Sequence, residues 1–123
     1  MTISWSVADV LRAPAVHAGG RVVVTGVLYL DEELGFRIFQ EKDETYDERI
    51  VLDIDDPVAA AKLRDALVGA GGTPEYLGPS VIDAEARAAG GTIALEHILT
   101  VYLGDPAKRN VHVVEVRPNP WAR

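Results

Sequence analysis

The segment that most constrains the fold is RVVVTGVLYL, residues 21–30, which is rich in β-branched residues and apolar on both faces. Such a run is typical of a strand that enters a hydrophobic core. Gly26 lies in its middle, where glycine weakens a strand unless a bulge or a sharp bend requires it. We therefore expect a strand over residues 21–30 that enters the core, with a bulge or a sharp bend at Gly26.

Two further strands are expected before the middle of the chain. The alternation that follows Gly35 predicts a strand over residues 35–41. In residues 50–54, apolar Ile50, Leu52 and Ile54 alternate with a more polar face, which predicts a third strand. The polar run EKDETYDER between them predicts a long acidic connection.

Two helices have recognisable ends. Ser6 and Asp9 have the spacing of a capping box at the start of a short helix. Asp56 and Pro57 are typical of the N-cap and first turn of a second helix, which the glycines of residues 69–72 end.

Residues 73–90 are ambiguous. A strand could begin at Val81, with Ala84, Ala86 and Ala88 on one face. The run AEARAA is also strong helix-forming material. We expect a short helix or an irregular segment here.

The sequence predicts a final pair of strands over residues 92–103 and 111–116, joined by the turn-forming sequence GDPAKRN. The order of expected elements is then helix, three strands, helix and two strands. A helix between the third and fourth of five strands is the connectivity of the OB-fold, a small five-stranded barrel.

The residues that open the chain support this comparison. Residues 7–28, VADVLRAPAVHAGGRVVVTGVL, are similar to the opening of many bacterial OB-fold domains, in which a short helix and a glycine turn precede a strand reading V-x-V-x-G-x-L. Val22, Val24, Gly26 and Leu28 occupy that pattern. The resemblance spans about residues 5–117 and is one of fold, not of a particular functional family.

The resemblance implies an all-β fold with accessory helices: a five-stranded OB-type Greek-key barrel in a single domain, residues 1–123. Residues 1–20 would form the N-terminal helix and turn, and residues 118–123 a tail. The residues expected in the core are Val22, Val24, Leu28, Ile38, Leu52, Leu63, Ile93, Leu95, Leu99, Val111 and Val113.

Composition excludes several classes of protein. The 123 residues, 48% hydrophobic and 25% charged, are typical of one globular domain. The chain has no cysteine, so disulfides, thiolate zinc sites and cysteine nucleophiles are excluded. No apolar run approaches the roughly 20 residues that span a bilayer, and the N-terminus lacks the apolar core of a signal peptide. These features predict a soluble, cytoplasmic protein.

Catalysis is not expected, and neither is a cofactor. The chain has no G-x-S-x-G sequence and no phosphate-binding glycine loop. His17, His97 and His112 are scattered, and a hairpin centred near Ala107 would separate the last two. A weaker hypothesis is an enzyme with a divalent-metal site at residues 53–56, because hard cations bind clustered carboxylates. A solvent-facing strand edge and a helix cap explain the acids of that segment, Asp53, Asp55 and Asp56, equally well.

The negative charge is concentrated in one part of the chain. Residues 31–56 contain eleven acidic residues and three basic ones, a net charge of −8, whereas the whole chain carries −7. A field of that sign repels phosphate backbones and attracts basic surfaces. Nucleic acid is therefore an unfavourable partner, although OB-folds commonly bind it. An oligonucleotide- or small-ligand-binding domain that uses Phe36, Phe39, Lys108 and Arg109 remains the alternative hypothesis.

The leading hypothesis is a non-catalytic module that binds a protein through the acidic segment. Aromatic side chains among the acids would serve as anchors and the carboxylates would attract a basic partner. The residues of this predicted surface are Phe36, Phe39, Glu41, Asp43, Glu44, Tyr46, Asp47 and Glu48. In charge and size the chain resembles bacterial immunity proteins and antitoxins, which block basic toxins such as nucleases. The simpler interpretation is a surface that only keeps the domain soluble.

Overall fold

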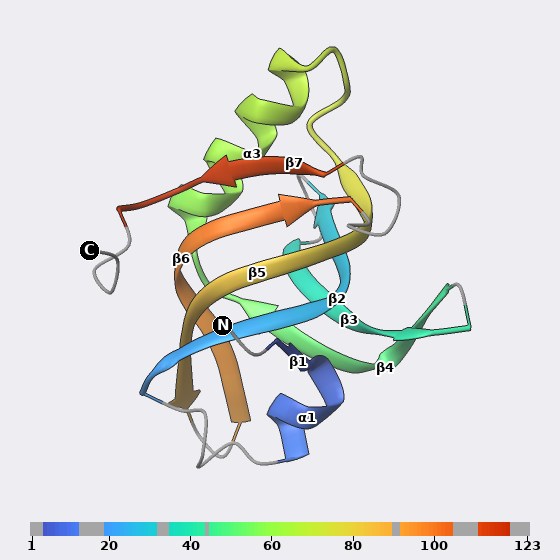
Figure 1. Cartoon of the computed structure of the whole chain (residues 1–123), viewed down its shortest axis with the longest axis vertical. Helices are drawn as coiled ribbons and strands as arrows, with labels where there is room; N and C mark the ends of the chain where they lie inside the picture. Colours follow the sequence, from blue (N-terminus) through green and yellow to red (C-terminus); the bar gives the residue numbers. More distant parts are fainter. Residues whose placement is uncertain are drawn as a thin grey trace.

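The computed structural model of the chain describes residues 4–12, 19–31, 35–43, 45–89, 92–104 and 111–118. These residues form a mostly β structure with two helices (Figure 1). In chain order the elements are β1 (Trp5–Ser6), α1 (Val7–Arg12), β2 (Arg21–Asp31), β3 (Gly35–Lys42), β4 (Thr45–Ile54), α3 (Pro57–Gly69), β5 (Tyr76–Ala89), β6 (Thr92–Leu103) and β7 (His112–Glu115).

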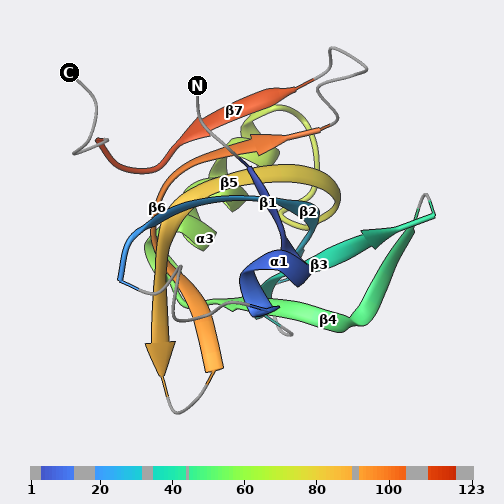
Figure 2. The ribbon, with the colours of Figure 1, turned by 60° about the horizontal axis from the view of Figure 1, so that its bottom comes forward.

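Five of the strands pair in a closed ring, which Figure 2 shows from a second side. β2 is antiparallel to β3 along one edge and to β5 along the other. β3 continues to β4, β4 runs parallel to β6, and β6 returns to β5. β7 is antiparallel to the C-terminal part of β6, and β1 makes a short parallel pairing with β2. α1 and α3 lie at opposite ends of the ring in Figure 1.

The strand that closes the ring is the segment for which we expected a helix or irregular structure. Residues 76–89 form β5, a single strand of 14 residues, so that expectation was wrong. Tertiary contacts outweigh the helix propensity of this segment. β5 pairs with β2 on one edge and with β6 on the other, and it buries Ile82, Ala84 and Ala86 in the core. The fourth and fifth strands of the ring are therefore β5 and β6, whereas the sequence predicted the strands at residues 92–103 and 111–116 for these places.

The expected starts of both helices are confirmed. The Ser6 hydroxyl accepts a hydrogen bond from the Asp9 N–H at 3.1 Å, as an N-cap does. Asp56 caps α3 by accepting from the Ala59 N–H at 3.1 Å, and Pro57 occupies the first turn. Val7 of α1 and Leu63 of α3 are fully buried, so both helices contribute to the core.

All but two of the predicted core residues are buried. The exceptions are in the final strand, where Val113 is 51% exposed and Val111 is only partly buried. Val114 and Val116 are buried instead. Because residues 113 and 114 are both valine, the sequence alone does not show which face of the strand is buried. Val114 pairs with the buried Val101 and therefore faces the core.

The acidic segment is not the long connection that its polarity predicted. β3 extends to Lys42 and β4 begins at Thr45, so most of EKDETYDER lies in two paired strands. Phe39 pairs with Val51 whereas Gln40 pairs with Asp47, so residues 48–50 of β4 form a bulge. Bulges bend and twist a strand. Residues 40–43 and 45–50, which we call the hairpin arm, extend away from the ring in Figure 2.

Gly26 is required because the backbone of β2 passes very close to β3 at this position. A Cβ atom at this position would lie 2.5 Å from the Phe39 carbonyl oxygen and 2.9 Å from a side-chain carbon of Ile38. We expect Gly26→Ala to lower the free energy of unfolding by about 1–3 kcal/mol, because the added methyl group overpacks the core. Urea unfolding followed by circular dichroism measures the change.

Gly20→Ala is the matched control, because a Cβ there would meet no atom within 4 Å. Equal stability of the Gly26→Ala variant and the control would show that β2 and β3 do not approach this closely.

Candidate functional site

Two rows of side chains cross the outside of the ring. One row comprises Pro79, Val27, Phe39 and Val51, and the next comprises Leu77, Tyr29, Arg37 and Asp53. They alternate along the strands with core residues such as Leu28, Ile38 and Leu52. Successive side chains of a strand point to opposite faces, so these rows form the outer face of β5, β2, β3 and β4.

An aromatic cluster lies on this outer face. The Phe39 ring is 4.9 Å from the Tyr46 ring and 6.3 Å, edge-on, from the Tyr29 ring, measured between centroids. Such arrangements are favourable for aromatic pairs. Phe39 is only 8% exposed although it does not belong to the central core. The two tyrosines therefore present their rings and hydroxyl groups around a covered phenylalanine.

Beside the cluster lies a groove, which we call the outer groove. It has a volume of about 300 Å³ and is lined by Val27, Thr45, Tyr46, Leu77, Gly78 and Pro79. Leu77 is 54% exposed, so the groove has an apolar wall that is open to solvent. Tyr46 also borders a second, charged hollow on the hairpin arm, together with Lys42, Asp47, Glu48 and Arg49. Tyr46 thus joins an apolar surface to a charged one, whose lining holds two acidic and two basic side chains.

Local hydrogen bonds determine the ionisation of two side chains on this face. From Glu41 to Arg49 the sequence has five acidic and two basic residues. Hydrogen bonds from the Arg49 side chain and its backbone N–H lower the pKa of Asp47, so this carboxylate stays ionised. Burial, and then the nearby Asp31 carboxylate, raise the pKa of Tyr29, so its hydroxyl stays protonated and donates to Asp31 at 3.2 Å.

The structure separates the predicted surface residues into two groups. Phe39 and the arm residues Glu41, Asp43, Tyr46, Asp47 and Glu48 lie on the outer face or on the hairpin arm. Phe36 lies on the inner side of β3 as part of the core and is 8% exposed, so little of its ring is open to a partner on the outer face. Glu44, Lys108 and Arg109 lie outside the described residues.

Four residues of this face were not predicted from the sequence: Val27, Tyr29, Leu77 and Pro79. The first two belong to a strand that is apolar on both faces, which indicated that the outer side of β2 is covered or used. The last two lie in the segment expected to be helical or irregular, so no local signal placed them beside Tyr46.

The three aspartates of the hypothetical cation site at residues 53–56 are in different environments. Asp53 is exposed and lies 3.9 Å from the Arg37 guanidinium, and Asp55 is exposed. Asp56 is 5% exposed and accepts four hydrogen bonds: from the Ala59 N–H at 3.1 Å, the Ile98 N–H at 2.8 Å, and Arg117 at 2.5 Å and 2.9 Å. Its carboxylate is therefore committed to capping α3 and to pairing with Arg117.

This buried pair determines the ionisation of Asp56. Burial alone would raise the pKa of Asp56, but the hydrogen bonds from Arg117, Ile98 and Ala59 together lower it below its ordinary value. Arg117 also donates to the Ile98 carbonyl at 2.9 Å. The contacts join the start of α3, the middle of β6 and the segment after β7.

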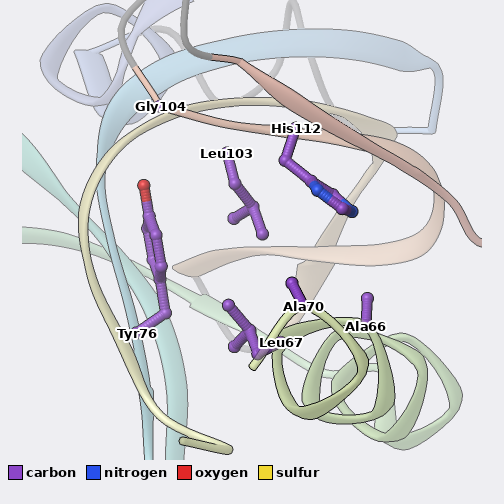
Figure 3. A pocket seen from close by; sticks show the side chains of 7 residues that line it. All are labelled: Ala66, Leu67, Ala70, Tyr76, Leu103, Gly104 and His112. Atoms are coloured by element: carbon purple, nitrogen blue, oxygen red, sulfur yellow. The ribbon is translucent and has the colours of Figure 1, made fainter. Parts of the chain in front are cut away.

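An apolar pocket opens elsewhere, between the C-terminal half of α3 and the strands. It has a volume of about 300 Å³ and is lined by Ala66, Leu67, Ala70, Tyr76, Leu103, Gly104 and His112. Figure 3 shows Tyr76 and His112 on opposite sides of it. Its volume is at the lower end for small-molecule sites. His112 pairs with Leu103, so the expected separation of His112 from His97 along the hairpin is confirmed.

No family model, curated protein or solved structure matches this chain. Among the described residues, neither helix has the length and apolar character needed to cross a membrane.

We expect Asp56→Asn to lower the free energy of unfolding at pH 7 by about 3–5 kcal/mol, because Arg117 would keep its charge without a counter-ion. The lowered pKa of Asp56 also predicts an acid dependence. The contribution of Asp56 is complete above its unfolded pKa of about 3.9 and is lost as pH falls through the folded pKa. Urea unfolding in steps from pH 5 to pH 2.5 should show this loss in the natural protein.

Asp55→Asn is the control, since Asp55 is the exposed neighbour. If the Asp56→Asn variant kept the full acid dependence of the natural protein, the pairing of Asp56 with Arg117 would be refuted.

Proposed function

We propose that this protein is a non-catalytic binding module that takes a basic protein partner on the outer groove and the hairpin arm. The observation that carries the proposal is the continuity of the two surfaces. Tyr46 lines both the apolar groove and the charged hollow of the arm. A partner segment can therefore bury an apolar group in the groove while its cationic groups meet the carboxylates.

The two surfaces have complementary roles in binding. Burial of apolar and aromatic side chains supplies most of the affinity at protein interfaces, and tyrosine is enriched at the residues that contribute most. The acidic arm, exposed at Glu41, Asp43 and Glu48, would accelerate association with a basic surface. Lysine and arginine fit both surfaces, because their apolar stems can lie in a groove while their charged ends remain near acids.

We further propose that the ring is a barrel of the OB type. Its pairing order, β2-β3-β4-β6-β5 and back to β2, and the position of α3 between the third and fourth ring strands support this. OB-folds bind their ligands on the face of the second and third strands. The corresponding strands here, β3 and β4, carry Phe39 and Tyr46.

Among basic partners, the charge of the arm favours a protein that itself binds phosphate groups. An acidic surface can occupy a site built for a nucleic-acid backbone, as in immunity proteins and antitoxins that block nuclease toxins. The proposed partner class is therefore a basic toxin that the module neutralises.

Single-stranded nucleic acid is the alternative ligand, since exposed aromatic rings can stack on bases. The acids of the arm oppose it, because a strand would have to bring its phosphates beside Glu41, Asp43 and Glu48. Binding of a small molecule in the pocket of Figure 3 is a second alternative, supported by that pocket's apolar lining.

To test the proposal, the protein is immobilised and exposed to lysate of its source cell, and retained proteins are identified by mass spectrometry. We expect a stoichiometric basic protein that high salt releases. The triple variant Glu41→Gln, Asp43→Asn, Glu48→Gln should slow its association by about tenfold or more, because steering raises association rates by 10 to 10³. Tyr46→Ala should instead accelerate its dissociation.

A second triple variant, Asp55→Asn, Asp65→Asn, Glu115→Gln, removes the same charge from exposed positions away from the arm. Equal effects of the two triple variants on association would argue against the arm as the interface. Binding of a fluorescent oligothymidine of 20 nucleotides at physiological salt would favour the nucleic-acid alternative.

A further inference from the structure

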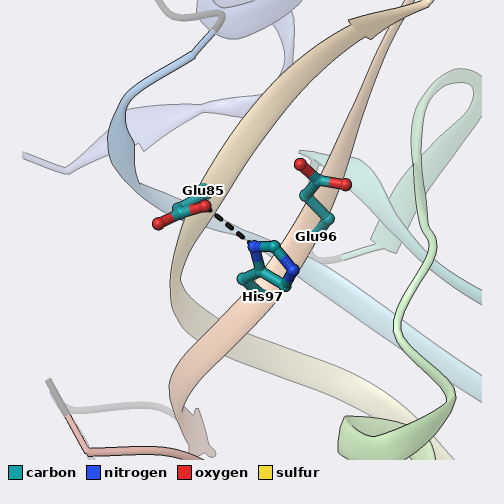
Figure 4. Close-up of side chains that lie close together, drawn as sticks. All are labelled: Glu85, Glu96 and His97. Atoms are coloured by element: carbon teal, nitrogen blue, oxygen red, sulfur yellow. Dashed lines mark hydrogen bonds and ion pairs between the residues drawn. The ribbon is translucent and has the colours of Figure 1, made fainter. Parts of the chain in front are cut away.

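A second bulge, in β6, places three metal-ligating side chains together. Glu85 pairs with Glu96 and Asp83 pairs with Thr100, so residues 97–99 of β6 lie opposite a single residue of β5. His97 adopts a left-handed backbone with φ of 45°. Neighbours in a regular strand point to opposite faces, but here Glu96 and His97 both approach Glu85 (Figure 4).

The spacing of the donor atoms suits a single ion. His97 Nδ1 lies 2.9 Å from Glu85 Oε2, and one ligand atom from each of Glu85, Glu96 and His97 lies within 4.8 Å of the others. Ligands of a zinc ion at the usual 2.0–2.2 Å lie roughly 3.0–3.5 Å from one another. The His97–Glu85 distance nearly meets this already, and the Glu96 carboxylate would have to move closer by up to about 1.3–1.8 Å.

The environment of the cluster favours a cation. Glu85 and Glu96 are directly opposite each other on adjacent strands, where like charges destabilise a sheet. The side chains of Glu85, Glu96 and His97 are 33%, 21% and 61% exposed, so an ion and a water ligand can reach them. The Arg87 guanidinium, 3.3 Å from Glu96, is the competing cation.

We propose that Glu85, Glu96 and His97 bind a divalent transition-metal ion, with zinc the best fit. One imidazole and two carboxylates form a mixed nitrogen and oxygen set that suits Zn²⁺ better than Ca²⁺ or Mg²⁺, which prefer oxygen alone. A water molecule would complete four-coordination. This site is independent of the proposed binding face.

The ion would link β5 to β6 at the bulge. The next residue of β6, Ile98, is the one whose N–H and carbonyl are held by Asp56 and Arg117. Zinc would therefore stabilise the point at which β6, α3 and the segment after β7 meet, and binding should raise the melting temperature.

The experiment uses the full chain without a histidine tag, stripped with EDTA and titrated with Zn²⁺ by calorimetry at pH 7.5. We expect one ion per chain with micromolar affinity. Glu96→Gln and His97→Asn should each weaken binding at least about tenfold. Asparagine is chosen because it tolerates the left-handed backbone. Co²⁺ should give the absorption bands of a site with nitrogen and oxygen ligands.

Two variants separate the site from its alternatives. Arg87→Gln removes the competing cation and should raise the affinity for Zn²⁺, a gain that loss of folding cannot imitate. His112→Gln removes an exposed imidazole elsewhere and should change nothing. Absence of stoichiometric Zn²⁺ binding to the natural protein, unchanged affinity in Glu96→Gln, or an equal loss in His112→Gln would each overturn the proposal.

Discussion

β2 hydrogen-bonds to β3 along one edge and to β5 along the other, and the closed ring depends on this double pairing. The strand must bend to serve both neighbours, and at Gly26 the Phe39 carbonyl leaves no room for a side chain. The same strand divides the molecule into inside and outside. Leu28 faces the core, whereas Val27 and Tyr29 face outward. The strand pairing that closes the core therefore also positions the side chains of the candidate binding face.

At both bulges the regular strand pairing is interrupted, and polar side chains make hydrogen bonds there instead. In β4 the bulge at residues 48–50 lies within the hairpin arm, and the Asp47 carboxylate accepts a hydrogen bond from the Arg49 N–H there. In β6 the bulge frees the backbone of Ile98, which Asp56 and Arg117 then satisfy, and it gathers Glu85, Glu96 and His97. Polar groups buried without partners are costly, so Asp56 and Arg117 compensate for the ladder bonds lost at the buried Ile98.

The candidate binding face combines segments that are distant in the chain. The acidic residues and Tyr46 come from the hairpin arm, and their character could be predicted because charge is a property of the sequence itself. Leu77 and Pro79 join them only because β5 closes the ring against β2. Phe36 and Phe39 look alike in the sequence, yet Phe36 belongs to the core and Phe39 to the outer face.

The sequence by itself determined the caps of both helices, the bent strand at residues 21–30, most of the core and the acidic segment. These features follow from side-chain chemistry and from periodicities that need only a few neighbouring residues. The tertiary structure decided that residues 76–89 are a strand, that Val114 and not Val113 turns inward, and that His97 meets two glutamates. In each case the deciding contact is with a strand elsewhere in the chain, and its burial and hydrogen bonds outweigh local preferences too small or too evenly balanced to fix the outcome.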